Sequence, residues 1–209
     1  MQKEKSNNTL KALIVIDVQN DFLPQGALPV NNGDEIIPVI NQLLQQDFDV
    51  IIATKDWHPQ DHTSFAINQG KQPGDTMEIG GIKQTLWPVH CVENSVGADF
   101  PPKLDTKAFE KVFYKGMEKA IDGYSAFYDA GNDHSTGLAE YLHTKGVSDL
   151  YFVGLATDYC VKFSVLDAAK LGFNTYVIME GCRAINLHPD DEANTIQEMR
   201  QAGVHILSR

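Results

Sequence analysis

Three side chains of this chain have the types and the setting that covalent catalysis requires. Cys160 follows a short apolar run after one turn, whereas Asp17 and Lys115 directly end two other such runs. A cysteine nucleophile needs a proton acceptor and a group that stabilises its thiolate, and Asp17 and Lys115 could fill these two roles. If Thr157 or Asp158 caps a following helix, the thiol lies in its first turn, where exposed amides favour the thiolate. The alternatives are a buried structural cysteine, a turn-capping aspartate and a solvated lysine.

A second group of side chains has the composition of a metal site. Asp56 and His58 stand two residues apart in an extended segment and so project to the same side, and His90 from a later loop could complete the set. One carboxylate and two imidazoles suit Zn²⁺, Fe²⁺ or Mn²⁺, with positions left open for water or substrate. His62 could add a further ligand or support the others. The alternative is a polar loop with scattered histidines.

Aromatic residues flank both groups in the sequence. They are Phe22, Trp57, Trp87, Tyr124 and Phe127. A planar ring could stack between such side chains, which would make them the walls of a small-molecule pocket. The alternative is that they belong to the ordinary core.

The elements that must position these residues are short apolar runs that alternate with helix-length amphipathic stretches. Strands are predicted over 12–16, 49–54, 111–114, 149–155, 175–179 and 204–207, and helices over 35–46, 135–145, 159–171 and 190–201. Strands that are apolar throughout and separated by helices indicate a parallel sheet covered on both faces. The sequence therefore predicts an α/β fold, a three-layer α/β/α sandwich around a mostly parallel sheet of about six strands. Ligands of such sheets bind outside the carboxyl ends of the strands, where the polar residues above would converge.

The length of 209 residues suits one domain, which we expect to span residues 1–209. The segment 55–107 departs from the strand–helix alternation and is rich in proline, glycine and histidine. A loop of this length within a compact domain is usually functional. We therefore expect an irregular metal-binding insertion that partly covers the site.

Charge and cysteine content bear on partners and compartment. The formal net charge of −11 argues against non-specific binding to nucleic acid or to anionic membranes. The three cysteines, Cys91, Cys160 and Cys182, are too sparse for a disulfide framework and fit a reducing compartment. No stretch approaches the ~18 apolar residues of a spanning helix, and the first apolar run is too short for a signal sequence. We expect a cytoplasmic protein. The sequence does not decide whether it forms a homo-oligomer, because no stripe of residues that would mark a subunit interface stands out.

Five stretches carry a resemblance to a known family. They are 12–22 (ALIVIDVQNDF), 54–58 (TKDWH), 87–92 (WPVHCV), 114–127 with its KG and DGYSAF elements, and 154–161 (GLATDYCV). In this order, over nearly the whole chain, they resemble the isochorismatase-like cysteine hydrolases, whose fold is Rossmann-like. The DWH and WPxHC elements resemble the nicotinamidase branch, because other branches commonly lack the metal ligands.

The resemblance implies a division of catalytic work. Cys160 would be the nucleophile and would form a thioester. Asp17 would take its proton, pass it to the departing ammonia and activate the hydrolytic water, while Lys115 would hold Asp17 and the thiolate in place. Backbone N–H groups of Ala156 and Cys160 would form the oxyanion hole, beside a cis peptide between Leu155 and Ala156.

The resemblance also implies a cofactor, a substrate and an activity. Asp56, His58 and His90, with His62 as a further candidate, would hold one divalent metal ion, zinc foremost and iron or manganese as alternatives, while Phe22, Trp87 and Tyr124 would line the substrate ring. The expected reaction is hydrolysis of nicotinamide, or of an analogue, to nicotinate and ammonia in NAD salvage. The competing interpretations are a related amidohydrolase acting on pyrazinamide or a carbamoyl compound, and a non-catalytic metal-binding or thiol-sensing domain.

Overall fold

A computed structural model describes residues 9–79, 81–131 and 134–208. Its centre is a six-stranded sheet in the order β5-β2-β1-β6-β7-β8, in which every pairing is parallel. The strands are β1 (Leu10–Ile16), β2 (Val50–Asp56), β5 (Lys111–Lys115), β6 (Val147–Leu155), β7 (Asn174–Arg183) and β8 (His205–Leu207). The predicted mostly parallel sheet of about six strands is therefore confirmed.

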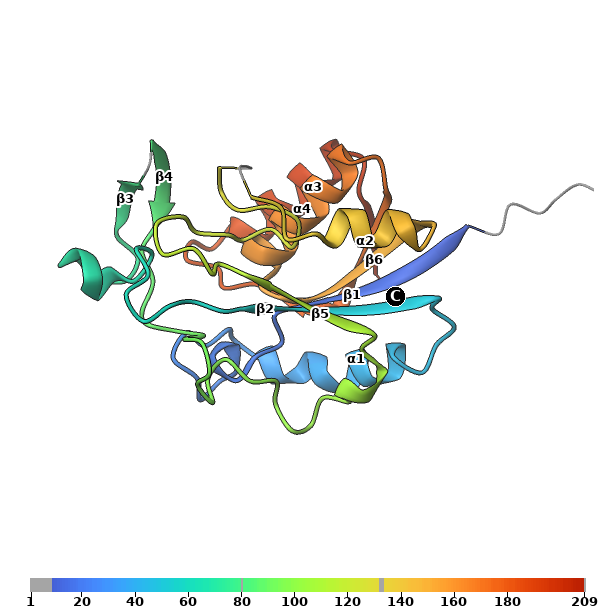
Figure 1. The fold of residues 1–209 in the computed structure, drawn as a ribbon, viewed down its shortest axis with the longest axis horizontal. Helices are drawn as coiled ribbons and strands as arrows, with labels where there is room; N and C mark the ends of the chain where they lie inside the picture. The colour runs from blue at the N-terminus through green and yellow to red at the C-terminus, as the bar shows by residue number, and fades with distance from the viewer. Residues whose placement is uncertain (1–8, 80, 132–133, 209) are drawn as a thin grey trace, which may run out of the picture.

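Helices cover the sheet from both sides. Figure 1 shows α1 (Ile36–Leu43) on one face and α2 (Leu138–Thr144), α3 (Lys162–Lys170) and α4 (Asp191–Gln201) on the other. Short 3-10 turns occupy Asn20–Phe22, Gly33–Glu35, Ala66–Gln69 and Thr106–Ala108. The layers are those of the predicted α/β/α sandwich. No helix in the part of the chain that the structure describes is long and apolar enough to cross a membrane.

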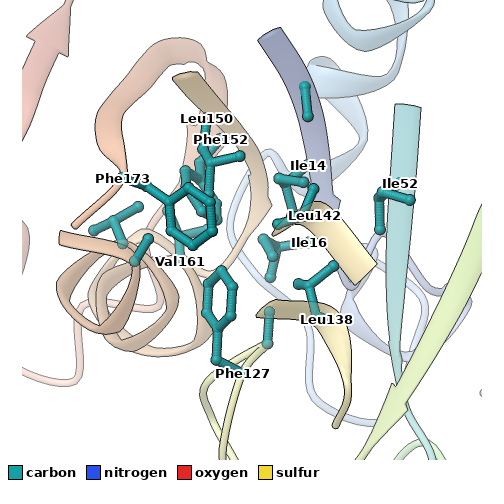
Figure 2. Close-up of a cluster of buried hydrophobic side chains, with 14 of the residues drawn as sticks. Ile14, Ile16, Ile52, Phe127, Leu138, Leu142, Leu150, Phe152, Val161 and Phe173 are labelled. Carbon is teal, nitrogen blue, oxygen red and sulfur yellow. The ribbon is translucent and has the colours of Figure 1, made fainter. Parts of the chain in front are cut away.

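The strands are apolar throughout because both of their faces are buried. Along β1, Ile14 and Ile16 belong to a core cluster shared with α2, α3 and α4, whereas Leu13 and Val15 belong to a second cluster under α1. Figure 2 shows the first cluster, in which labelled residues of β1 and β6 meet Phe127 and Phe173 from outside the sheet. The two packed layers hold the carboxyl ends of the central strands in fixed positions.

Besides shifts of a few residues at the ends of α1, α2 and β2, the structure departs from the expected elements at three places. The segment 55–107 is not wholly irregular, since β3 (Thr76–Ile79) and β4 (Ile82–Thr85) pair as an antiparallel hairpin outside the main sheet. The two strands have only four residues each. β3 alternates through Met77 and Ile79, but β4 has a single apolar residue, Ile82, so neither forms an apolar run of the kind that marks the strands of the main sheet. In Figure 1 this hairpin stands at the end of the molecule toward which β2 runs.

The other two departures lie at the ends of predicted elements. β7 continues to Arg183 instead of ending at Met179, because a register shift opposite 152–154 lets Cys182 pair with Gly154. The helix expected over 159–171 is in fact a π-helical segment, Thr157–Val161, followed by α3. Such π segments are frequent at functional sites.

Candidate active site

Asp17, Lys115 and Cys160, here called the reaction cluster, meet beyond the carboxyl ends of neighbouring strands. Lys115 Nζ lies 2.8 Å from Asp17 Oδ2 and 3.3 Å from Cys160 Sγ. The same ammonium forms an ion pair with Asp56, which lies opposite Lys115 in the pairing of β2 with β5. All of these side chains are buried. The structure thus brings together the three residues in which the sequence suggested nucleophilic chemistry.

The Asp17 carboxyl has an environment suited to moving a proton. It is fully buried, and burial raises its pKa from 3.8 to about 6 although Lys115 works in the opposite direction. The Thr54 hydroxyl donates to Asp17 Oδ1 at 2.6 Å, which orients the carboxyl. Burial would lower the pKa of Lys115, but the carboxylates of Asp17 and Asp56 outweigh it and hold that pKa well above its ordinary value. At neutral pH Asp17 can therefore act as a base beside a permanent cation.

Cys160 lies in the π-helical segment. Its surroundings correct two expectations, namely that the thiol is held as a thiolate and that Thr157 or Asp158 caps the helix. Burial raises the pKa of the Cys160 thiol well above its ordinary value, and Lys115 offsets this only in part. Helix-terminal amides therefore do not leave a free thiolate in the resting protein, and a proton acceptor is required. Neither Thr157 nor Asp158 caps the helix through its side chain. The peptide between Leu155 and Ala156 is cis, which confirms the expectation at that bond.

Asp56, His58 and His90, here called the metal group, lie beside the reaction cluster. Asp56 Oδ2 is 3.8 Å from His58 Nε2 and 3.9 Å from His90 Nε2. These separations are too long for hydrogen bonds. They lie below about 4.2 Å, which is the largest distance between two ligand atoms that each bind one ion at ~2.1 Å. The donor set and its spacing fit a divalent metal ion.

The histidines of the metal group are oriented by backbone carbonyls. His58 Nδ1 donates to the Gly116 carbonyl and His90 Nδ1 donates to the Pro88 carbonyl, both at 2.8 Å. Each bond leaves Nε2 as the nitrogen that can bind a metal, the usual arrangement around histidine ligands. Burial lowers the pKa of His90 to about 4, so its ring is neutral at pH 7, as ligation requires.

His62 lies behind the metal group. Its ring centroid is 4.4 Å from that of His58, and its Nδ1 is 2.7 Å from the Ser64 hydroxyl. Among the described residues, His62 forms a possible ligand set with His58 and Asp122, and this set shares only His58 with the metal group. Its place is therefore against the His58 ring.

A narrow pocket with a cavity volume of about 20 Å³ opens onto both groups. Its lining consists of Phe22, Leu28, Asp56, Trp87, His90, Tyr124, Ala156, Tyr159, Cys160 and Ile185. Trp87 Nε1 donates to the Tyr124 hydroxyl at 2.9 Å, which joins two of the three expected ring-lining residues. Trp57 and Phe127 do not line the pocket, since Trp57 packs on Tyr114 and Phe127 lies in the core. The site is a small aromatic pocket that ends at a buried thiol.

Residues 11–209 match the isochorismatase domain. The chain belongs to the isochorismatase family. It is 45% identical to the nicotinamidase of Escherichia coli strain K12 over 199 residues, which is 94% of this chain and 93% of that protein. The yeast nicotinamidase bound to the inhibitor nicotinaldehyde superimposes with a TM-score of 0.91 at 35% identity, covering 96% of this chain and 100% of the other. The Pyrococcus horikoshii pyrazinamidase in complex with zinc superimposes with a TM-score of 0.78 at 37% identity, covering 95% of this chain and 99% of the other.

This isochorismatase-family site also depends on residues whose roles the sequence did not reveal. Gln19 is fully buried, donates from Nε2 to the Asp56 carbonyl at 2.8 Å and accepts the Asp56 N–H at 2.9 Å. It therefore holds both backbone groups of a metal-group residue. Gly116 has φ +65°, and a β-carbon there would lie 2.4 Å from the His58 ring. Only glycine lets the chain approach His58 so closely.

Contrary to expectation, Asp158 does not cap the helix but binds the loop on the other side of the pocket. Its two carboxylate oxygens accept the backbone N–H groups of Ile185 and Asn186 at 2.9 and 2.8 Å. Ile185 lines the pocket, so Asp158 ties the π-helical segment that carries Cys160 to the loop after β7. A partner 27 residues away in sequence could not be read from local spacing.

Proposed function

We propose that this isochorismatase-family protein hydrolyses nicotinamide to nicotinate and ammonia through a thioester on Cys160. The observation that carries the proposal is the buried contact of Lys115 with both Asp17 and Cys160 at the end of an aromatic pocket. The nicotinamidases among the relatives of this chain support the same reaction over nearly its full length.

The reaction cluster supplies the proton transfers of both half-reactions. Asp17 accepts the thiol proton of Cys160 while Sγ forms a bond to the carboxamide carbon. Asp17 then returns that proton to the leaving nitrogen, the C–N bond breaks, and ammonia departs from a thioester. In the second half, Asp17 takes one proton from water, and the resulting hydroxide attacks the thioester. The C–S bond breaks, and the acid that forms leaves as nicotinate after giving its remaining proton to solvent. The proton returns to the Cys160 sulfur and restores the thiol.

Charge that develops during these steps must be stabilised among buried side chains. The backbone N–H groups of Ala156 and Cys160, which both line the pocket, are proposed to hold the oxyanion. One such donor is typically worth ~3 kcal/mol of transition-state stabilisation. Lys115 keeps its proton throughout and stabilises the thiolate and Asp17.

Asp56, His58 and His90 are proposed to hold one zinc ion, with iron or manganese as alternatives that the same ligands accept. A bound divalent ion would supply a Lewis-acidic position for the ring nitrogen of the substrate. Phe22, Trp87 and Tyr124 would flank the ring.

Two further proposals concern the domain organisation of the protein and its location in the cell. We propose one hydrolase domain over 1–209, in which the segment 55–107 acts as the metal-binding insertion because it contributes Asp56, His58 and His90. A cytoplasmic location is proposed because all three cysteines are free thiols.

An amidase assay with and without chelator tests the function. Ammonia release should be rapid with nicotinamide and pyrazinamide, and at least about 100-fold slower in kcat/KM with benzamide, which lacks a ring nitrogen. A chelator should remove most activity, and added Zn²⁺ should restore it. Turnover of nicotinamide no faster than that of unrelated amides would favour another small-amide hydrolase. Full activity after complete metal removal would exclude the proposed role of the metal group.

The pKa of Asp17 predicts a rise of activity through pH 6. The base must be ionised, so kcat/KM should be about tenfold lower at pH 5 than at pH 7.5. Because the pKa of Asp17 is raised above 3.8 by folding, its contribution to stability is fully present below pH 3.8 and is lost as pH rises through about 6. Acidification to pH 5 therefore does not unfold the protein through this group, which tryptophan fluorescence at each pH can verify. A flat profile between pH 5 and 7 would contradict Asp17 as the base.

A further inference from the structure

Asp21 forms a contact that the reaction scheme does not use. Its carboxylate Oδ2 accepts the backbone N–H of Cys91 at 2.7 Å, across 70 positions of sequence. Cys91 directly follows His90 of the metal group and has φ +45°, in the left-handed region that residues with a β-carbon rarely occupy. A backbone conformation of this kind persists only where its surroundings hold it.

The other backbone group of Cys91 reaches the second histidine of the metal group. The Cys91 carbonyl accepts the His58 N–H at 3.0 Å. The peptide groups of one residue therefore connect His90, His58 and the Asp21 carboxylate. A shift of this backbone would move both imidazoles relative to Asp56.

The Asp21 carboxylate itself lies directly against Gly97, where a residue with a side chain would not leave room for it. The Asp21 N–H donates to the Gly97 carbonyl at 3.0 Å. A β-carbon at Gly97 would lie 2.1 Å from Asp21 Oδ2 and 2.5 Å from Oδ1. A side chain at position 97 would therefore push the carboxylate away from Cys91.

We propose that Asp21 is a positioning residue for the metal group, acting through the backbone of Cys91 and seated by Gly97. The proposal rests on the metal site of the proposed function and adds the residue that sets the distance between its two histidines. Groups that support metal ligands from outside typically change metal affinity by about 10–100-fold when mutated. Gln19 has the corresponding contact with the backbone of Asp56.

The test measures Zn²⁺ affinity of the full chain by competition with a chromophoric chelator. Asp21→Asn and Gly97→Ala disturb the contact from its two sides, and each should weaken binding by about 10–100-fold. The double variant should bind no more weakly than the weaker single variant, because both changes remove one contact. Asp49→Asn is the matched control, since Asp49 also accepts a backbone N–H, that of Lys11 at 2.9 Å, away from the pocket. It should change affinity by less than about twofold.

A Co²⁺ spectrum gives a second readout, because the visible bands of the bound ion report the ligand geometry. The bands should change in Asp21→Asn and remain unchanged in Asp49→Asn. If the unmodified chain fails to bind Zn²⁺, the metal site of the proposed function fails. If it binds, and both Asp21→Asn and Gly97→Ala match the control in affinity and spectrum, the positioning role is overturned. Failure of both variants to fold under conditions where Asp49→Asn folds would overturn it as well.

Discussion

Replacing Cys160 by alanine is expected to reduce amide hydrolysis by at least about 10⁴-fold. The substitution removes the atom that bonds to the carboxamide carbon, while Asp17 and Lys115 keep their ion pair. Folding should survive, because a thiol of this size leaves only a small cavity. Ammonia release at saturating nicotinamide, measured with a circular dichroism melt of the same sample, separates lost chemistry from lost structure.

Cys182→Ala is the matched control for this experiment. Cys182 is also a buried free thiol and packs in the same core cluster as Cys160, but it does not line the pocket. Its removal should cost about 1–2 kcal/mol of stability through a small cavity and leave kcat within about twofold. Substantial hydrolysis by Cys160→Ala would show that the thioester route is wrong.

Lys115→Met should damage both activity and stability. Methionine preserves much of the volume, but it leaves the carboxylates of Asp17 and Asp56 buried without their shared cation. Breaking a buried ion pair in this way typically costs about 3–5 kcal/mol. Without the cation, the pKa of Asp17 should rise further, so the base would be largely protonated at pH 7. We expect a loss of at least about 10³-fold in kcat/KM.

The pH dependence identifies the cause of the instability. Protonation relieves the unpaired carboxyls, so urea unfolding of Lys115→Met in chelator should show a larger deficit at pH 8 than at pH 5. Lys55→Met provides the comparison, because Lys55 is a buried lysine near the end of β2 whose partner, Asp99, is 60% exposed. That variant should lose about 1 kcal/mol or less and keep its activity. An equal, pH-independent deficit in both variants would refute the shared-cation role of Lys115.

Much of the reaction cluster could be predicted because its positions follow from strand ends. Buried parallel strands are continuous apolar runs, so the first polar residue after a run marks the carboxyl end. Asp17 and Lys115 were located in this way, and Cys160 by its place after β6. The segment 55–107 was recognisable because it interrupts the periodic pattern. The hairpin within it was not, because β3 and β4 are only four residues long and together hold three apolar residues.

The contacts that refine the site lay beyond sequence reasoning. Gln19, Asp21 and Asp158 each bind backbone groups 27 to 70 positions away, so their partners depend on which loops pack together. The sequence also predicts a lowered pKa for the Cys160 thiol, whereas the structure raises that pKa. Position at a helix start suggested a thiolate, but complete burial has the larger effect on the thiol.

The sequence by itself determined the layers of the fold, the strand ends and the residue types that meet there, because periodicity and polarity are local properties of the chain. Tertiary structure alone decided the strand order that places Lys115 against both Asp17 and Asp56, the burial that keeps the Cys160 proton in place, and the backbone contacts that orient the histidines. These features arise from the packing of distant segments, since distances and desolvation exist only once the layers have closed around the site.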